Sequence, residues 1–156
     1  MISIKTNSVL NFLELCEKSQ EIATRLDYQY TRYDIKYTMC LIELSSELLG
    51  KDVNLKSCLR HTDEIENIDD KYKFIFFVHT NIDNAYKALL SLEKTFIRNY
   101  FPSYQGLFFR ASIVERKKNN TSSEMISDLK NLLFSNSDNN SDFLFMKENW
   151  KNGYWY

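Results

Sequence analysis

The segment from Arg60 to Val78 decides the expected fold and reads Arg-His-Thr-Asp-Glu-Ile-Glu-Asn-Ile-Asp-Asp-Lys-Tyr-Lys-Phe-Ile-Phe-Phe-Val. Its first arm alternates polar with apolar residues, and its second arm is rich in aromatic and β-branched residues. The pair Asp69-Asp70 stands between the arms, and aspartate is a residue that favours turns. The segment therefore predicts a β-hairpin.

Hydrophobic spacing predicts the elements that precede the hairpin. Apolar residues three and four positions apart predict a helix from Ser8 to about Tyr30, with Phe12 and Leu26 in its apolar stripe. The continuous apolar run 38–45 predicts a strand that is buried on both of its faces.

The elements that follow the hairpin continue the same alternation. Asn81 is expected to cap a helix that extends to about Tyr100, and the apolar run 107–115 predicts a strand. A capping box at 121–124 opens another helix, and the tail from Phe143 is expected to begin with a short edge strand. This order predicts an α/β sheet with helices packed on its faces.

Composition limits the classes of function. The chain has 156 residues, a net charge of −1 and a pI near 6.1, so one domain and no nucleic-acid partner are expected. It contains no signal peptide, no membrane-spanning apolar stretch and no phosphate-binding glycine motif, so we expect a cytoplasmic chain without membrane insertion and without a cofactor. A basic cluster is read as a solvated strand end and loop, and comprises Arg110, Arg116, Lys117 and Lys118.

In its layout the hairpin segment resembles the central hairpin of GGDEF domains, the diguanylate cyclase family. In that family an Arg-x-x-Asp stands five residues ahead of a Gly-Gly-(Asp/Glu)-Glu-Phe turn. Here the upstream pair is Arg60-His61-Thr62-Asp63, and the turn that follows reads Asp69-Asp70-Lys71-Tyr72.

The resemblance covers roughly residues 33–134 and implies the palm-like, ferredoxin-like central sheet of the nucleotidyl cyclases. It divides the chain into an N-terminal helix (1–31), a degenerate GGDEF-like domain (32–134), and a linker with an aromatic tail (135–156).

The resemblance also implies a catalytic site. In the enzymes, two metal ions are held by an aspartate that ends the first strand and by an acidic residue of the turn. Glu43 stands near the first of these positions. Lys71, or Lys73 if the hairpin is one residue longer, replaces the turn carboxylate, and a cation cannot ligate Mg²⁺. Asp69 and Asp70 replace glycines that let the backbone approach the nucleotide. These departures predict a chain that is not an enzyme, with Glu43 at most a vestigial metal ligand.

Arg60 and Asp63 match the site at which many family members bind cyclic-di-GMP. An arginine fork can engage guanine or a phosphate, and a carboxylate can accept from guanine N–H groups. The alternative is a local ion pair at a strand entrance, worth about 0–1 kcal/mol when exposed. The sequence leaves both interpretations open.

Three functions are compatible with this sequence. The first is a catalytically inactive regulatory or scaffold protein that acts through protein contacts in a bacterial cytoplasm. The alternative is a cyclic-di-GMP receptor that binds through Arg60 and Asp63. The third is an RNA-binding sheet, on which five phenylalanines of the predicted strands would stack bases: Phe74, Phe76, Phe77, Phe108 and Phe109.

Two segments are candidates for contact with a partner. The stripe of Phe12 and Leu26 either packs on its own domain or forms a coiled-coil seam to a second copy, which would make a homodimer. The tail either folds over a sheet edge or docks on a partner through its aromatic residues, Trp150, Tyr154, Trp155 and Tyr156.

Overall fold

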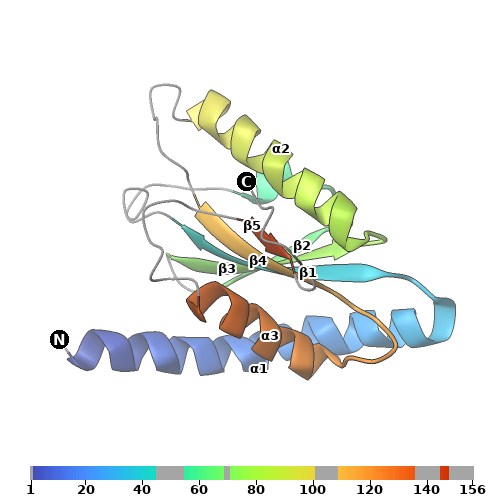
Figure 1. Cartoon of the computed structure of the whole chain (residues 1–156), viewed down its shortest axis with the longest axis horizontal. Helices are drawn as coiled ribbons and strands as arrows, with labels where there is room; N and C mark the ends of the chain where they lie inside the picture. Colours follow the sequence, from blue (N-terminus) through green and yellow to red (C-terminus); the bar gives the residue numbers. More distant parts are fainter. Residues whose placement is uncertain (1, 45–54, 69–70, 101–108, 136–144, 148–156) are drawn as a thin grey trace.

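The structure of the chain is a computed structural model that describes residues 2–44, 55–68, 71–100, 109–135 and 145–147. Figure 1 shows its three helices and one sheet. In chain order the elements are α1 (Ile2–Tyr33), β1 (Tyr37–Leu44), a 3₁₀ turn (Lys56–Cys58), β2 (Glu64–Asn67), β3 (Tyr72–Val78), α2 (Ile82–Tyr100), β4 (Phe109–Glu115), α3 (Ser122–Ser135) and β5 (Phe145–Lys147).

The strands form one five-stranded sheet in the order β2-β3-β1-β4-β5. β1 pairs antiparallel with both β3 and β4, β2 pairs antiparallel with β3, and β5 adds to β4 in parallel as a short edge strand. Helices α1 and α3 lie on one face of the sheet and α2 lies on the other (Figure 1). The predicted α/β class, with helices on both faces, is confirmed.

The central strand β1 is buried along all eight of its residues, as the apolar run predicted. Met39 and Leu41 pack in the core beneath α1 and α3, while Cys40 and Ile42 pack in the core beneath α2. Each such side chain contributes roughly 1.5–3 kcal/mol when it is fully buried. The two cores therefore attach the helices to opposite faces of the same strand.

The predicted hairpin is present. β2 and β3 pair antiparallel, and the backbone N–H of Ile68 donates to the carbonyl of Tyr72 at 3.1 Å where the two strands join. The turn residues Asp69 and Asp70 lie outside the described residues. Strand β3 is almost entirely buried, which agrees with its aromatic and β-branched composition.

Helix α1 begins at Ile2, earlier than the predicted start at Ser8. Ser8 lies inside the helix, where a serine costs only about 0.5 kcal/mol relative to alanine. The helix ends where Asp34 adopts a left-handed conformation (φ 58°), and the N–H of Asp34 donates to the carbonyl of Tyr30 at 3.0 Å. Aspartate is one of the residues that tolerate this conformation.

Leu26 does not face a partner. Its side chain is only 2% exposed and packs in the core with Met39 and with Leu129 of α3. The prediction that Leu26 contacts a partner is therefore corrected, because apolar spacing identifies a buried face without identifying what covers that face. The side chain of Phe12 lies outside the described part of the chain.

The predicted caps of the two later helices are confirmed. The Asn81 side-chain oxygen accepts from the N–H of Asn84 at 2.8 Å at the start of α2. The Thr121 hydroxyl accepts from the N–H of Glu124 at 3.2 Å and donates to the Glu124 carboxylate at 3.1 Å at the start of α3. Both caps satisfy N–H groups that have no acceptor within the first helical turn.

The packing of α1 on the sheet can be tested by substitutions on its buried and exposed faces. We expect Leu26→Glu to lower the free energy of unfolding by about 3–5 kcal/mol, because it places an unpaired carboxylate in the core. Tyr28→Glu is the matched control: its side chain is 60% exposed, so a change within about 0.5 kcal/mol is expected. Urea denaturation followed by circular dichroism measures both, and equal losses in the two variants would contradict this packing.

Candidate functional site

Arg60 and Asp63 form a bidentate ion pair beside the end of β3. Arg60 Nη2 donates to Asp63 Oδ1 at 2.8 Å, and Arg60 Nε and the backbone N–H of Arg60 both donate to Oδ2 at 3.1 Å. The same Nη2 lies 2.9 Å from the carbonyl oxygen of Val78 and 2.8 Å from the hydroxyl of Thr80. The pair therefore ties the loop that precedes β2 to the end of β3.

The two members of this pair differ in accessibility. The Asp63 side chain is 3% exposed, whereas that of Arg60 is 56% exposed. The hydrogen bonds to Asp63 raise the pKa of Arg60 further above its usual value. The structure shows the local ion pair that the sequence allowed, with Nε and Nη2 of Arg60 already engaged by described residues.

Glu43 lies near the end of β1 between its strand neighbours Tyr72 on β3 and Arg110 on β4. Arg110 Nε donates to Glu43 Oε1 at 2.6 Å, and the Tyr72 hydroxyl donates to Oε2 at 2.6 Å. Lys71 Nζ lies 3.8 Å from Oε2. The Glu43 and Arg110 side chains are only 10% and 9% exposed, so this pair is nearly buried.

Two opposing effects set the pKa of Glu43. Burial by itself would raise the pKa, because it disfavours the charged form. The hydrogen bonds from Arg110 and Tyr72 and the charges of Arg110 and Lys71 together outweigh burial. The pKa of Glu43 therefore lies below its usual value, and the carboxylate is ionised at neutral pH.

The described side chains around Glu43 do not fit a magnesium ion. Both carboxylate oxygens already accept hydrogen bonds, and the neighbouring charges, Arg110 and Lys71, are cations. Among the residues that the structure describes, no three His, Cys, Asp or Glu side chains gather as a metal site would require. Asp69 and Asp70 of the turn lie outside those residues.

The structure does not bring the two predicted sites together. Tyr72, which bonds Glu43, begins β3, whereas Val78, which accepts from Arg60, ends it. At about 3.3 Å per residue the two clusters are separated by about 20 Å along the strand. They are therefore separate sites at opposite ends of one buried strand.

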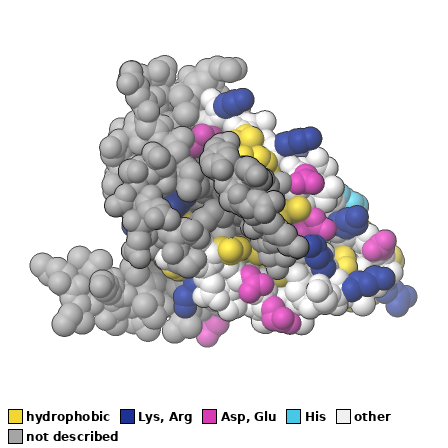
Figure 2. Space-filling model, in the orientation of Figure 1, with side chains coloured by type: hydrophobic (Ala, Val, Ile, Leu, Met, Phe, Trp, Pro, Cys, Tyr) yellow, Lys and Arg dark blue, Asp and Glu magenta, His cyan; other side chains and the backbone are white. Residues whose placement is uncertain are grey.

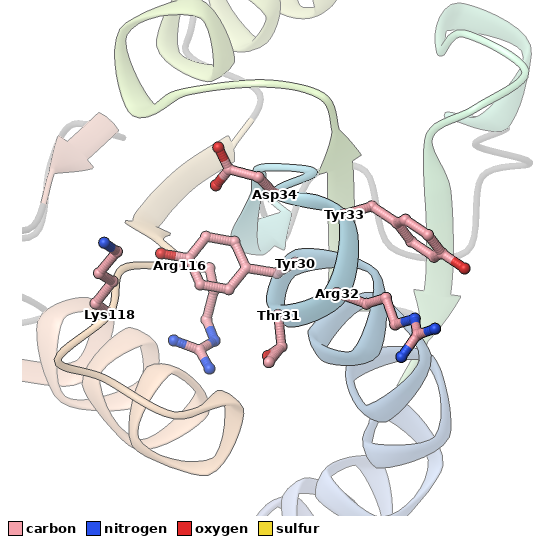
Figure 3. A pocket seen from close by; sticks show the side chains of 7 residues that line it. All are labelled: Tyr30, Thr31, Arg32, Tyr33, Asp34, Arg116 and Lys118. Carbon is pink, nitrogen blue, oxygen red and sulfur yellow. The ribbon is translucent and has the colours of Figure 1, made fainter.

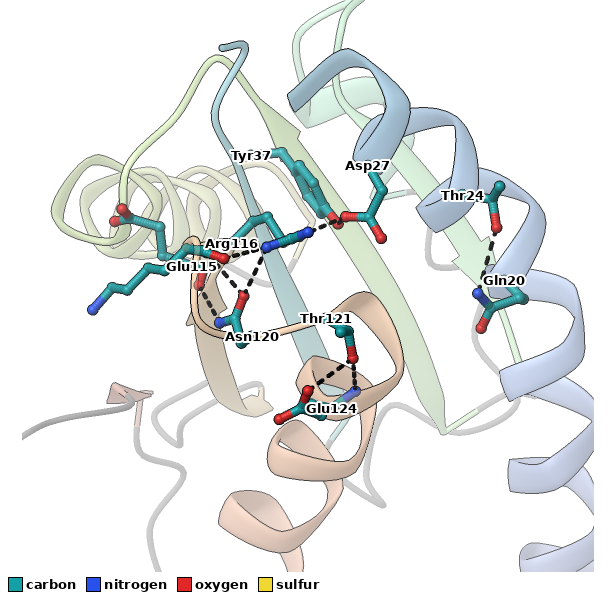
Figure 4. Close-up of polar contacts among 10 residues, drawn as sticks. Gln20, Thr24, Asp27, Tyr37, Glu115, Arg116, Asn120, Thr121 and Glu124 are labelled. Atoms are coloured by element: carbon teal, nitrogen blue, oxygen red, sulfur yellow. Dashed lines mark hydrogen bonds and ion pairs between the residues drawn. The ribbon is translucent and has the colours of Figure 1, made fainter. Parts of the chain in front are cut away.

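A third polar network attaches α1 to the sheet (Figure 4). Arg116 Nε donates to Asp27 Oδ1 at 2.7 Å, and the hydroxyl of Tyr37 donates to the same oxygen. Burial, reinforced by the hydrogen bond to Asp27, raises the pKa of Tyr37, so its hydroxyl remains a donor. Asn120 holds the loop after β4 by donating to the carbonyl of Glu115 at 3.0 Å.

The sequence-based interpretation of the basic cluster is partly wrong. The side chains of Arg110 and Arg116 are 9% and 12% exposed, and each is paired with a carboxylate. Their partners stand 67 and 89 residues away in the chain, so no local pattern could have revealed them.

A pocket of about 540 Å³ opens beside the C-terminal end of α1. Its lining combines residues 30–34 with Arg116 and Lys118 from the loop after β4 (Figure 3). The Arg116 guanidinium lies 4.7 Å from the ring centroid of Tyr30. Sequence reasoning missed this pocket because its two lining segments are far apart in the chain.

The described phenylalanines of β3 offer no stacking platform, while Phe108 and the side chain of Phe109 lie outside the described part of the chain. Phe74, Phe76 and Phe77 are at most 1% exposed and belong to the two cores beneath the helices. Figure 2 shows cations and carboxylates interspersed over the described part of one face. Neither feature favours an RNA-binding sheet, which needs exposed aromatics and a basic groove.

The remaining predicted contact residues lie outside the described part of the chain: Trp150, Tyr154, Trp155 and Tyr156. None of the helices that the structure describes is both long enough and apolar enough to cross a bilayer.

Sequence comparison matches the chain to no family model and to no curated protein. Structure comparison, in contrast, finds GGDEF domains. The GGDEF domain of DgcB from Caulobacter crescentus, in complex with c-di-GMP, matches with a TM-score of 0.64 and 6% identity, over 82% of this chain and 86% of that one. The diguanylate cyclase SiaD of Pseudomonas aeruginosa, in complex with its activator SiaC, matches with a TM-score of 0.61 and 15% identity, over 94% and 69%.

The active GGEEF domain of a diguanylate cyclase from Vibrio cholerae matches with a TM-score of 0.63 and 8% identity, over 81% of this chain and 92% of that one. At these identities the comparisons show the fold alone. The chain has the palm-like α/β fold of the GGDEF domains, as the hairpin resemblance predicted.

These matches contradict the prediction that the chain is not an enzyme, because the matched structures are mainly domains of diguanylate cyclases. The prediction rested mainly on the residues of one short turn, whereas the fold is one that diguanylate cyclases also have.

The Glu43 cluster predicts a specific pH dependence. We expect Glu43→Gln to lower the free energy of unfolding by about 1.5–3 kcal/mol at pH 7, because it removes the charge-assisted bonds to Arg110 and Tyr72. The pKa of Glu43 is lower in the folded state than its usual value of 4.5. Its contribution is therefore complete above about pH 4.5 and is lost as the pH falls through the lower, folded-state pKa.

Urea denaturation of wild type and variant between pH 3 and pH 8 measures this dependence. The difference between them should shrink below about pH 4.5. Glu21→Gln, which neutralises an exposed carboxylate on α1, is the matched control and should show no such pattern. A difference that is independent of pH would contradict the role of the Glu43 charge.

Proposed function

We propose that this chain is a regulatory domain of a bacterial cytoplasmic signalling pathway, with the GGDEF fold, that works through protein–protein contacts. In this proposal residues 1–31 receive the signal, residues 32–134 form the domain, and residues 135–156 are a linker and tail. The turn Asp69-Asp70-Lys71-Tyr72 stands in place of the signature turn of the family.

The observation that carries this proposal is the location of the exposed aromatic residues. In the described part of the chain, the large hydrophobic side chains left exposed are Tyr28 and Tyr33, at 60% and 61%. Both belong to α1, and their rings meet edge to face with centroids 6.3 Å apart. Tyrosine is enriched at protein interfaces because it combines an apolar ring with a polar tip.

The comparisons support a protein partner for a fold of this kind. SiaD, which has the same fold over most of this chain, has been solved in complex with its activator SiaC. Helix α1 is also joined to the sheet by two ion pairs, Arg25–Glu64 at 2.6 Å and Asp27–Arg116 at 2.7 Å. A protein that binds α1 would thus contact a helix that ion pairs join to β2 and to the end of β4.

Photo-crosslinking in the native host tests this proposal. Replacing Tyr28 with the photoreactive residue benzoylphenylalanine should give a discrete cross-linked species in irradiated cells, which mass spectrometry can identify. A second copy of the chain in that species would establish a homodimer through α1. The same replacement at Lys87, an exposed position on α2, is the matched control. Absence of any Tyr28-specific species would contradict a contact on this surface.

Binding of cyclic-di-GMP through Arg60 and Asp63 is the second candidate function. It is favoured by the exposed guanidinium of Arg60, which the buried Asp63 holds in place. The matched DgcB domain was solved in complex with this dinucleotide. In this proposal Arg60 binds guanine or a phosphate through Nη1, since Nε and Nη2 already donate to Asp63.

Calorimetry decides whether this receptor function exists. We expect wild type to bind cyclic-di-GMP, and Arg60→Lys to weaken binding at least tenfold, or about 1.4 kcal/mol, because a lysine that pairs with Asp63 has no second nitrogen for the ligand. Arg60→Lys keeps a cation beside Asp63 and so preserves the fold better than Arg60→Ala. Arg25→Lys, at another exposed and ion-paired arginine, is the control. Absence of heat with wild type at high micromolar ligand would exclude this function.

A further inference from the structure

Several side chains that line the pocket beside the end of α1 can donate hydrogen bonds to a ligand. Arg32, Lys118 and the hydroxyls of Tyr30 and Tyr33 line it, and none of them donates to another described residue. The carboxylate in the lining is that of Asp34. A ligand with several acceptor atoms can therefore pair with these donors.

The charge of the lining also favours an acidic ligand. Arg116 is already neutralised by Asp27, so the remaining charges are the cations Arg32 and Lys118 against Asp34. The C-terminal end of a helix has a partial negative charge, which disfavours binding of an anion there. Here the carbonyl of Tyr30 already accepts a hydrogen bond from the N–H of Asp34, which reduces the negative charge that an anion would meet.

The cations are spread rather than convergent. Figure 3 shows Lys118 on one side of the Tyr30–Arg116 stack and Arg32 on the other side. A compact anion such as phosphate would contact one of them, whereas an extended chain with several carboxylates could contact both. Small-molecule sites also enclose most of their ligand, while this pocket opens along the end of a helix.

The rim of the pocket supplies aromatic contact area. Tyr33 lines the pocket and packs against Tyr28, which continues the exposed aromatic surface along α1. Arg116 lies against the ring of Tyr30 and holds it in position. Tyrosine and arginine are the residue types that dominate binding energy at protein interfaces.

We infer that this pocket binds an acidic peptide segment of a partner protein, in which carboxylates alternate with apolar or aromatic residues. The carboxylates pair with Arg32 and Lys118, and the apolar residues pack on Tyr33 and Tyr28. This inference rests on the proposed function, since it assigns the surface and the chemistry of the partner.

Fluorescence anisotropy tests the inference with a labelled peptide in which glutamate alternates with phenylalanine. Wild type should bind it, and binding should weaken as salt is added. Arg32→Glu and Lys118→Glu should each lower the affinity at least tenfold. Both positions are exposed, so the melting temperature should change little. Lys94→Glu, a charge reversal at an exposed position on α2, should leave the affinity unchanged.

Three results would overturn the inference: no binding of the acidic peptide, equal binding of a peptide with lysine in place of glutamate, or affinity that survives both pocket reversals. Displacement of the peptide by inorganic tripolyphosphate at equal concentration would likewise overturn it, since it would show simple anion binding. If the peptide fails while Tyr28 still cross-links a partner in cells, this pocket assignment fails and the proposed function stands. If the peptide does not bind and Tyr28 does not cross-link a partner, the pocket assignment and the proposed function both fail.

Discussion

Both faces of β1 are buried, and this burial sets where the other strands and the helices lie. A strand buried along all eight of its residues requires a helical layer on each face and a paired strand on each edge. The sheet order places β3 and β4 on those edges, and the cores beneath α1, α3 and α2 cover the faces. Every candidate site then lies at an end of this buried strand, where polar side chains can reach water.

Arginine–carboxylate ion pairs lie near both ends of the central strand β1. Arg110 meets Glu43 at one end of β1, and Arg116 meets Asp27 at the other, with both arginines nearly buried. Removing one member of such a pair leaves an uncompensated charge, so these pairs strongly favour one arrangement of the elements. The second pair also fixes the end of α1, which forms the pocket and carries the exposed tyrosines.

The sites differ in how far local patterns predicted them. Arg60 and Asp63 stand three residues apart, so their ion pair could be anticipated from the sequence. Glu43 was placed as a vestigial metal ligand, yet its oxygens accept from Tyr72 and Arg110, which no spacing rule connects to it. Leu26 was correctly assigned to an apolar stripe, but its spacing could not distinguish its own sheet from a second copy.

The hairpin, the buried central strand, the caps at Asn81 and Thr121 and the α/β class could all be predicted from local patterns, because each follows from the period or turn chemistry of neighbouring residues. The packing of the folded chain sets which carboxylates Arg110 and Arg116 meet, which face of α1 is covered, and where the pocket forms. Those outcomes depend on contacts between segments far apart in the chain, and their geometry is set when the sheet and helices pack.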